Sequence, residues 1–366
     1  MDSAISLERS VTGSRAQSAV PLSRARVADD VAMLRTAAEL TRDINTAKPL
    51  VYWGDFLGSA ALGYAGLAGA IALSGMWAVA SALVAILGLY RAGSFIHELT
   101  HIRHRELPWF RFGWNAVIGA PLLIPSFMYE GVHNLHHNRT RYGTIEDPEY
   151  LPLALMKPWT LPLFVVTAAL APIALLLRFS VLTPLSLMIP ALRRLVVGQF
   201  SGLQINPKFR RRAPEGELAR QWAWQEGAAS IWGLTLIALV VSGVIPLRAF
   251  LIMLAIVSGT MLLNQTRTLV AHLWENEGEA MTVTAQYLDS VNVPPPATLP
   301  ALWAPVGLRY HALHHLLPSL PYHSLGEAHR RLSKALSADS PYHKSSYSGL
   351  PHLVARLARN TVTPRS

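Results

Sequence analysis

Two pairs of long apolar runs most constrain what this chain can fold into. The first pair occupies residues 50–73 and 76–96, and the second occupies residues 228–245 and 249–263. A helix rises 1.5 Å per residue, so a run of about 20 residues crosses the ~30 Å hydrocarbon core of a bilayer. The short breaks at Ser74 and Pro246 therefore predict two transmembrane hairpins. We expect the last helix to continue as far as His272.

The composition fits a membrane protein better than a soluble nucleic-acid-binding protein. Charged residues make up 15% of the 366 positions and hydrophobic residues make up 51%, while the mean hydropathy is positive at +0.28. The net charge is +10, and its basic residues flank apolar runs, which favours contact with anionic lipid headgroups rather than nucleic acid. Because the chain has no cysteine, nitrogen and oxygen atoms must supply the ligands of any metal it binds.

Histidines gather in three clusters, the first of which closes the second apolar run. The clusters are His97-x-x-x-His101, His133-x-x-His136-His137 and His311-x-x-His314-His315. Residues three or four apart share a helix face, so each cluster can direct several imidazoles at one site. Neutral imidazole binds zinc, copper, iron or nickel. So many histidines oversupply one tetrahedral zinc and fit two metals of higher coordination number. His104 shares the face of the first cluster, and His272 lies near the end of the fourth run; both are further candidates.

Two proline-containing regions are harder to assign. Residues 105–132 hold Pro121 and Pro125 in a short apolar patch, which favours an interfacial or re-entrant segment over a full crossing. Residues 151–198 contain two more apolar stretches, each interrupted by prolines. These stretches form either membrane-surface helices or one more hairpin, and we expect helices that lie beside the core.

With the three histidine boxes in this order, the chain resembles the membrane-bound fatty acid desaturase and hydroxylase superfamily over roughly residues 50–335. The acidic turn at 146–150 and the segments 308–310 and 317–323 around the third box are also similar to that family. The resemblance implies an all-α integral membrane protein with about four transmembrane helices in two hairpins. It also implies a cytoplasmic helical cap that carries a histidine-rich site with two non-haem irons, which activate O₂ and abstract hydrogen from an unactivated acyl chain.

The resemblance also assigns metal ligands, residue by residue. They are His97, His101, His133, His136, His137, His272, His311, His314 and His315. His104 has no counterpart in the family and remains a candidate ligand from its position alone. Acyl-CoA desaturases have an asparagine four residues before the isolated histidine, and it assists one iron. This chain has Thr268 at that position, which departs from the family pattern.

Several side chains near the boxes are candidates to orient the ligands. Glu98, Asp147 and Glu149 can accept hydrogen bonds from imidazole N–H groups, which fixes the ring orientation. The alternative for each is a surface carboxylate paired with a nearby arginine. His323, which follows the third box, is a further candidate for this outer layer.

We predict a desaturase that introduces a double bond into an acyl-lipid or acyl-CoA chain with O₂ and two electrons. The first alternative is a diiron hydroxylase of an alkyl or lipid chain, because the His-Glu-Leu-x-His form of the first box also occurs in alkane monooxygenases. A third possibility is an intramembrane zinc protease, since H-E-x-x-H is its signature and Glu98 would be the general base. That hypothesis leaves both H-x-x-H-H boxes unexplained.

The sequence also predicts partners, orientation and boundaries. We find no dinucleotide-binding glycine fingerprint or haem-binding stretch, so electrons must come from a separate ferredoxin or cytochrome b5-like carrier with its reductase. The substrate is a fatty acyl lipid, and nucleic acid is not a partner. The hairpin turns carry almost no charge, whereas lysine and arginine crowd the N-terminus, the 178–220 loop and the C-terminus, so both termini and the active site are expected on the cytoplasmic side. We expect a cytoplasmic tail at 1–48 without a signal peptide, a desaturase-like membrane and catalytic domain at 49–335, and a basic tail at 336–366.

Overall fold

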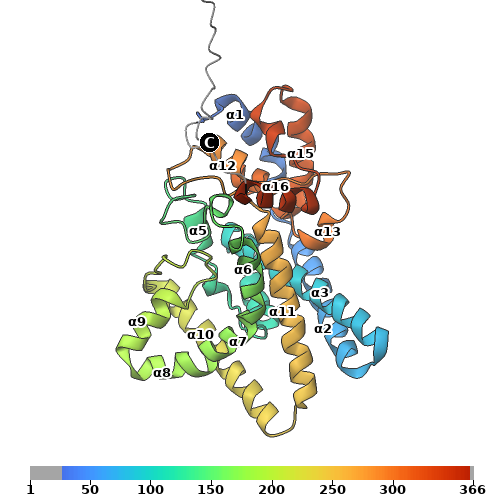
Figure 1. Ribbon diagram of the computed structural model, residues 1–366, viewed down its shortest axis with the longest axis vertical. Helices are drawn as coiled ribbons and strands as arrows, with labels where there is room; N and C mark the ends of the chain where they lie inside the picture. Colours follow the sequence, from blue (N-terminus) through green and yellow to red (C-terminus); the bar gives the residue numbers. More distant parts are fainter. Residues whose placement is uncertain (1–26, 363–366) are drawn as a thin grey trace, which may run out of the picture.

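The computed structural model describes residues 27–362, which fold into helices joined by loops (Figure 1). Within this range the only β structure consists of three isolated bridges. Residues 1–26 and 363–366 lie outside the described residues. Most of the predicted N-terminal tail, and with it the expectation of no signal peptide, therefore lies outside them too. The all-α prediction is confirmed for the described part of the chain.

Both predicted hairpins are present. They comprise α2 (Pro49–Ala72), α3 (Gly75–His101), α10 (Gly216–Val241) and α11 (Leu247–Leu269). In the first hairpin the two backbones touch, because a Cβ atom on Gly88 would lie 2.6 Å from the backbone nitrogen of Gly63. The expectation that the last helix reaches His272 is wrong, since α11 ends at Leu269 and the chain turns before the histidine.

Two opposite charges inside the first hairpin, Asp55 and Arg91, neutralise each other. Arg91 on α3 donates from Nε to the Asp55 carboxylate on α2 at 2.8 Å. The hydroxyl of Tyr322 also donates to Asp55, at 2.9 Å. Tyr322 begins α15 (Tyr322–Ala335), so this network ties the hairpin to the helices that follow the third histidine box.

Residues 151–198, where we expected shorter helices beside the core, contain a fifth helix that is long enough to cross a membrane. Residues Thr160–Met188 form one helical run of 29 residues, and five described helices have the length and apolar composition of membrane spans. The run includes α6 (Thr160–Val166), α7 (Ala171–Leu177) and α8 (Thr183–Met188), and it is followed by α9 (Pro190–Gln199). Proline lacks the N–H that an α-helix needs in its interior, and the run accommodates its prolines through short 3₁₀ and π turns between these pieces.

The region 105–132 forms no span. Its short helices are α4 (Phe110–Trp114), a π turn at Asn115–Gly119 and a 3₁₀ turn at Ser126–Met128. Trp114 is buried and donates its indole N–H to the carbonyl of Ala92 at 2.9 Å. This segment therefore packs against α3.

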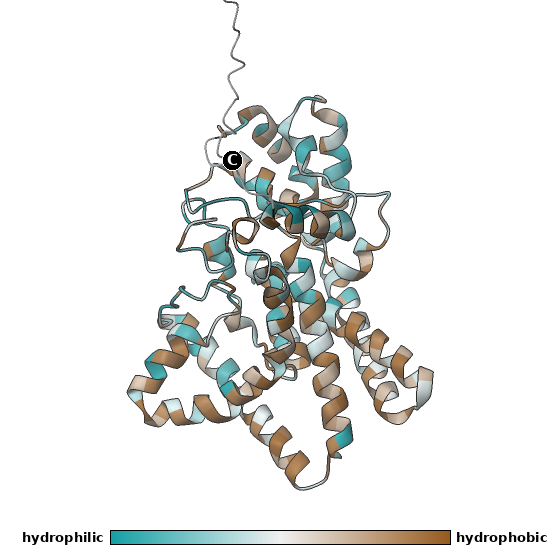
Figure 2. Cartoon of the chain, in the orientation of Figure 1, coloured by the Kyte–Doolittle hydropathy of each residue, from teal (hydrophilic) through white to brown (hydrophobic). Residues whose placement is uncertain are grey.

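The remaining helices form a polar cap at one end of the long helices, and Figure 2 shows hydrophobic residues concentrated on the long helices. The cap contains α1 (Val31–Leu40), α5 (His133–His136), α12 (Val283–Asp289), α13 (Pro300–Trp303), α14 (His311–Leu316), α15 and α16 (Leu350–Val362). Met33 and Ala37 of α1 are buried against α15, and Leu353 and Leu357 of α16 are buried as well.

Candidate metal centre and lipid cavity

The histidine boxes lie on short helical segments where the long helices meet the cap. His97 and His101 occupy the last two turns of α3, the second box lies on and just after α5, and the third lies on α14. His272 follows α11 and forms an antiparallel bridge with Ser290. Asn292, two residues further on, accepts the Leu313 N–H through its Oδ1 at 3.0 Å. One extended segment therefore ties the isolated histidine to the third box.

All nine histidines assigned from the family resemblance converge in two neighbouring groups. One group contains His97, His101, His133, His137 and His314, and the other contains His136, His272, His311 and His315. In each group one nitrogen from every ring lies within 4.8 Å of the others. His104 joins neither group, because it is exposed and its Nδ1 lies 2.8 Å from Arg111. The suggestion that His104 is a ligand is therefore not supported by its position.

The Nε2 atoms in each group have the spacing of ligands around a metal. His133 and His137 bring their Nε2 atoms to 3.0 Å, and His272 and His311 do the same. Metal–imidazole bonds of about 2.0–2.1 Å that meet at a right angle place two nitrogens about 3 Å apart. Both nitrogens of His97 are buried without a hydrogen-bond partner, which is costly unless a metal or another donor or acceptor occupies the space. The donor set thus fits two metal ions.

Carboxylates and the Tyr129 hydroxyl contact Nδ1 of these rings, the nitrogen opposite Nε2, as groups that orient metal ligands do. Nδ1 of His133 lies 3.0 Å from Glu149, and Nδ1 of His136 lies 3.0 Å from Asp147. Asp147 is itself buried and accepts the backbone N–H groups of Gly143 and Glu149 at 2.8 Å each. Of the two hypotheses for these carboxylates, the geometry favours the ligand-orienting one.

Burial keeps most of these imidazoles neutral, which is the form that binds a metal. It lowers the pKa of His133, His137 and His272 well below the usual value of 6.5. Burial also acts to lower the pKa of His136, but the carboxylates of Asp147, Glu149 and Asp289 together outweigh it and the net direction is upward. Burial raises the pKa of Glu149 to about 7.

The other predicted outer residues lie in different surroundings. Glu98 accepts the Tyr52 hydroxyl at 2.5 Å and the Tyr322 N–H at 3.2 Å, and its nearest approach to Nδ1 of His97 is 3.6 Å. Glu98 is thus held by hydrogen bonds from Tyr52 and Tyr322, and its carboxylate is not free to act as a general base at the metal site. Thr268 lines the cavity but donates to the Asn264 carbonyl, and His323 accepts the Lys48 N–H.

Sequence reasoning missed the groups that hold His272. The hydroxyl of Tyr142 lies 2.8 Å from Nδ1 of His272 and donates to Asp289 at 2.9 Å, and Ser290 Oγ lies 3.2 Å from the same nitrogen. Their separation from His272 in the sequence ranges from 17 residues for Asp289 to 130 for Tyr142, and none belongs to a motif. No local pattern signals them.

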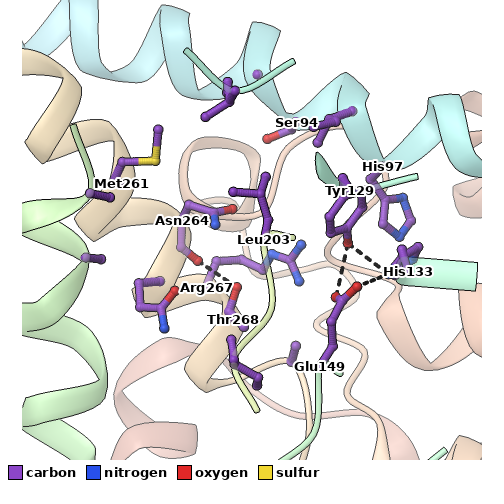
Figure 3. A pocket seen from close by; sticks show the side chains of 18 of the residues that line it. Ser94, His97, Tyr129, His133, Glu149, Leu203, Met261, Asn264, Arg267 and Thr268 are labelled. Carbon is purple, nitrogen blue, oxygen red and sulfur yellow. Dashed lines mark hydrogen bonds and ion pairs between the residues drawn. The ribbon is translucent and has the colours of Figure 1, made fainter. Parts of the chain in front are cut away.

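A cavity of about 430 Å³ opens directly beside both histidine groups (Figure 3). Its histidine lining comes from His97 and His133 of one group and from His136, His272 and His311 of the other. Most of the remaining wall is apolar and includes Leu89, Leu122, Ile124, Phe164, Met261 and Leu308. Polar side chains at the end of α11 and in the loop after α9 interrupt this apolar wall. The arrangement can hold an amphiphilic lipid against the metal site.

Comparison with known proteins adds two findings. The family model for fatty acid desaturases matches residues 74–347, a range that contains all nine converging histidines. The chain is also 50% identical over 336 residues to a protein named ceramide hydroxylase from Caulobacter vibrioides (strain NA1000 / CB15N). That alignment covers 92% of this chain and 95% of the relative.

Proposed function

This chain belongs to the fatty acid desaturase family, and on that premise we propose that it hydroxylates a ceramide-type lipid with O₂. The observation that carries this choice is its 50% identity to a ceramide hydroxylase across nearly the full length of both chains. The likeness extends well beyond the histidine boxes, and it supports hydroxylation, our first alternative, over the desaturation that the sequence alone favoured.

The proposed metal ligands are the nine histidines in their two groups of five and four. Two irons bound there would supply the oxidising power that an unactivated C–H bond requires. The chain's own residues present neutral imidazoles, and Asp147 and Glu149 orient the rings of His136 and His133.

The cavity would bind the substrate and position it for the reaction. Its apolar wall holds a hydrocarbon chain and excludes bulk water from the reacting carbon. Because five histidines from both groups line the same space, a chain bound there lies beside both proposed metal positions. Positioning of this kind decides which carbon reacts.

We further propose that the cap faces the cytoplasm and receives electrons from a separate acidic carrier. The net charge of +10 and exposed cap residues such as Lys334 and Lys344 support docking of such a partner. On this proposal turnover with the native donor slows as salt is added, because screening weakens the encounter.

Lipid analysis in a host that makes dihydroceramide but does not hydroxylate it tests the proposal. Expression of the wild-type chain should convert dihydroceramide to a product with one additional oxygen, as seen by mass spectrometry. His136→Ala is the inactive control, since His136 lies in a metal group and holds Asp147. A product that has instead lost two hydrogens would identify a desaturase, and an unchanged lipid profile with iron-loaded protein would overturn the proposal.

A further inference from the structure

The cavity beside the histidines contains a buried arginine that forms no direct ion pair. Arg267, in the last turn of α11, is only 8% exposed, and its Nε has no hydrogen-bond partner. None of the arginine ion pairs among residues 27–362 includes it. Figure 3 shows its side chain extending from α11 into the cavity, toward Tyr129 in this view. The Arg267 charge acts to lower the pKa of Glu149, which lines the same cavity, but the two side chains form no direct ion pair. A buried charge without a direct partner is costly to a fold, and in a membrane protein it marks a functional site by default.

The loop after α9 contributes an unpartnered acceptor to the same cavity. Oε1 of Gln204 is buried and has no hydrogen-bond partner. Nε2 of the same amide donates to the Phe209 carbonyl at 3.3 Å. That hydrogen bond fixes which end of the amide is the oxygen, so the group left over in Gln204 is an acceptor.

The two unpartnered atoms, Nε of Arg267 and Oε1 of Gln204, are chemically complementary. A guanidinium only donates hydrogen bonds, and an amide oxygen only accepts them. A ligand that satisfies both Arg267 and Gln204 must therefore carry an acceptor and a donor. A secondary amide offers both, as C=O and N–H. A carboxylate or an ester offers no donor, and it would leave the Gln204 oxygen facing another oxygen.

We propose that Arg267 and Gln204 bind the secondary amide of the lipid substrate, with Arg267 donating to the amide carbonyl and Gln204 accepting the amide N–H. This assignment rests on the proposed hydroxylation of a ceramide-type lipid and names the two residues that select its polar group. Asn264, three residues before Arg267 on the same helix, also lines the cavity. The apolar wall then contacts the hydrocarbon chain that is attached to the amide.

Ligand binding to the metal-loaded protein in detergent, without an electron donor, tests the assignment apart from catalysis. The probes are a short-chain dihydroceramide and its N-methyl analogue, which keeps the carbonyl but lacks the N–H. Their affinities are measured from the ligand-induced rise in the thermal unfolding midpoint. The variants are Arg267→Met, Arg267→Lys and Gln204→Leu. The control is Arg248→Met, the same substitution at an exposed position at the other end of α11.

We expect Arg267→Met to weaken dihydroceramide binding about 10- to 100-fold, because a hydrogen bond from a charged donor is lost. Arg267→Lys should also weaken binding, since lysine keeps the charge but loses the planar fork. Wild type should prefer dihydroceramide to the N-methyl analogue, and Gln204→Leu should abolish that preference. The Arg248→Met control should bind as wild type does.

The unfolding midpoint without ligand separates this role from a structural one. If Arg267 serves a ligand, Arg267→Met should unfold at the same temperature as wild type or higher, because a buried charge without a direct ion pair has been removed. Wild-type affinity in Arg267→Met, or a lower midpoint with unchanged affinity in Arg267→Lys, would overturn the assignment. A wild-type protein that binds dihydroceramide through these residues but never hydroxylates it would instead overturn the proposed function alone.

Discussion

The hydroxyl of Tyr142 lies 2.8 Å from Nδ1 of His272 and 2.9 Å from the carboxylate of Asp289. Asp289 can only accept when ionised, so the phenol donates its proton to Asp289 and its oxygen can accept the Nδ1–H of His272. This arrangement leaves Nε2 of His272 free to bind a metal, and that atom lies 3.0 Å from Nε2 of His311. Tyr142 therefore fixes the orientation of the one ligand that belongs to no histidine box.

Replacing this phenol should weaken metal binding in the group of four histidines. We expect Tyr142→Phe to lower the metal affinity there about 10- to 100-fold, since loss of an orienting partner has that typical effect. Competition with a chelator of known affinity measures the change. Tyr64→Phe is a matched control, because the Tyr64 hydroxyl donates to the Val117 carbonyl away from the histidines. Equal metal retention in the two variants would contradict the assigned role.

The two histidine groups should lose their metals independently. Wild type should contain about two irons per chain, and His101→Ala or His272→Ala should each reduce this to about one, since each removes a ligand from a different group. His352→Ala, which changes an exposed histidine on α16, should retain both metals. Elemental analysis of the purified proteins gives the counts. One zinc per wild-type chain would refute the two-iron site.

The first hairpin depends on close contact between two glycines. A Cβ atom at Gly88 would lie 2.6 Å from the Gly63 nitrogen and 2.7 Å from its Cα, both of which belong to the backbone. Gly88→Ala should therefore push α2 and α3 apart and destabilise the fold by about 1–3 kcal/mol. Gly58→Ala on α2 meets nothing within 4 Å and should have little effect. The thermal unfolding midpoints in detergent compare the two, and equal midpoints would argue against the contact.

The sequence predicted features that depend on local pattern. The length of the apolar runs and the short breaks at Ser74 and Pro246 identified both hairpins, because the thickness of the hydrocarbon core sets the length of an apolar helix that crosses it. Residues 160–188 were expected to be interrupted at their prolines, whereas short 3₁₀ and π turns carry one helical run past them. Spacing placed His104 on the face of His97 and His101, but α3 ends at His101, so the shared face ends there too.

Contacts between segments that are distant in the sequence could not be predicted from it. Tyr142 and His272 are 130 residues apart and meet only because the cap brings the two segments together. Arg267 and Gln204 belong to no motif, and only the folded chain shows that both line one cavity and that each has a buried atom without a hydrogen-bond partner. The histidine boxes could be found because eight of the nine proposed ligands are closely spaced in the sequence, and groups that orient ligands or bind substrate need no such spacing.

A histidine away from the metal site should make stability depend on pH. Nδ1 of His329 lies 2.9 Å from the Tyr342 hydroxyl, and burial lowers the pKa of His329 from 6.5 to about 4. Between these values the unfolded chain binds a proton that the folded protein does not, so stability is full above pH 6.5 and falls as the pH drops toward 4. Because His329 is partly exposed, we expect it to account for about 1 kcal/mol at pH 5.

The comparison of wild type with His329→Gln isolates this effect from acid loss of the metals. Both proteins should lose stability on acidification, but the wild type should lose more, because glutamine does not titrate. Unfolding in detergent at neutral and acidic pH measures the two losses. Identical losses would show that His329 does not titrate differently in the folded and unfolded chains.

The position of the new oxygen follows from the shared cavity. Arg267, Gln204 and five of the metal-site histidines all line one space of about 430 Å³. If the amide of the lipid is held at Arg267 and Gln204, only carbons close to the amide lie beside the histidines, and the far end of each hydrocarbon chain lies outside that space. Tandem mass spectrometry of the product should therefore place the hydroxyl within a few bonds of the amide. Arg267→Met should spread hydroxylation over more carbons, because the polar anchor that sets the register is gone. A hydroxyl near the methyl end would mean that the lipid enters the cavity in the opposite direction.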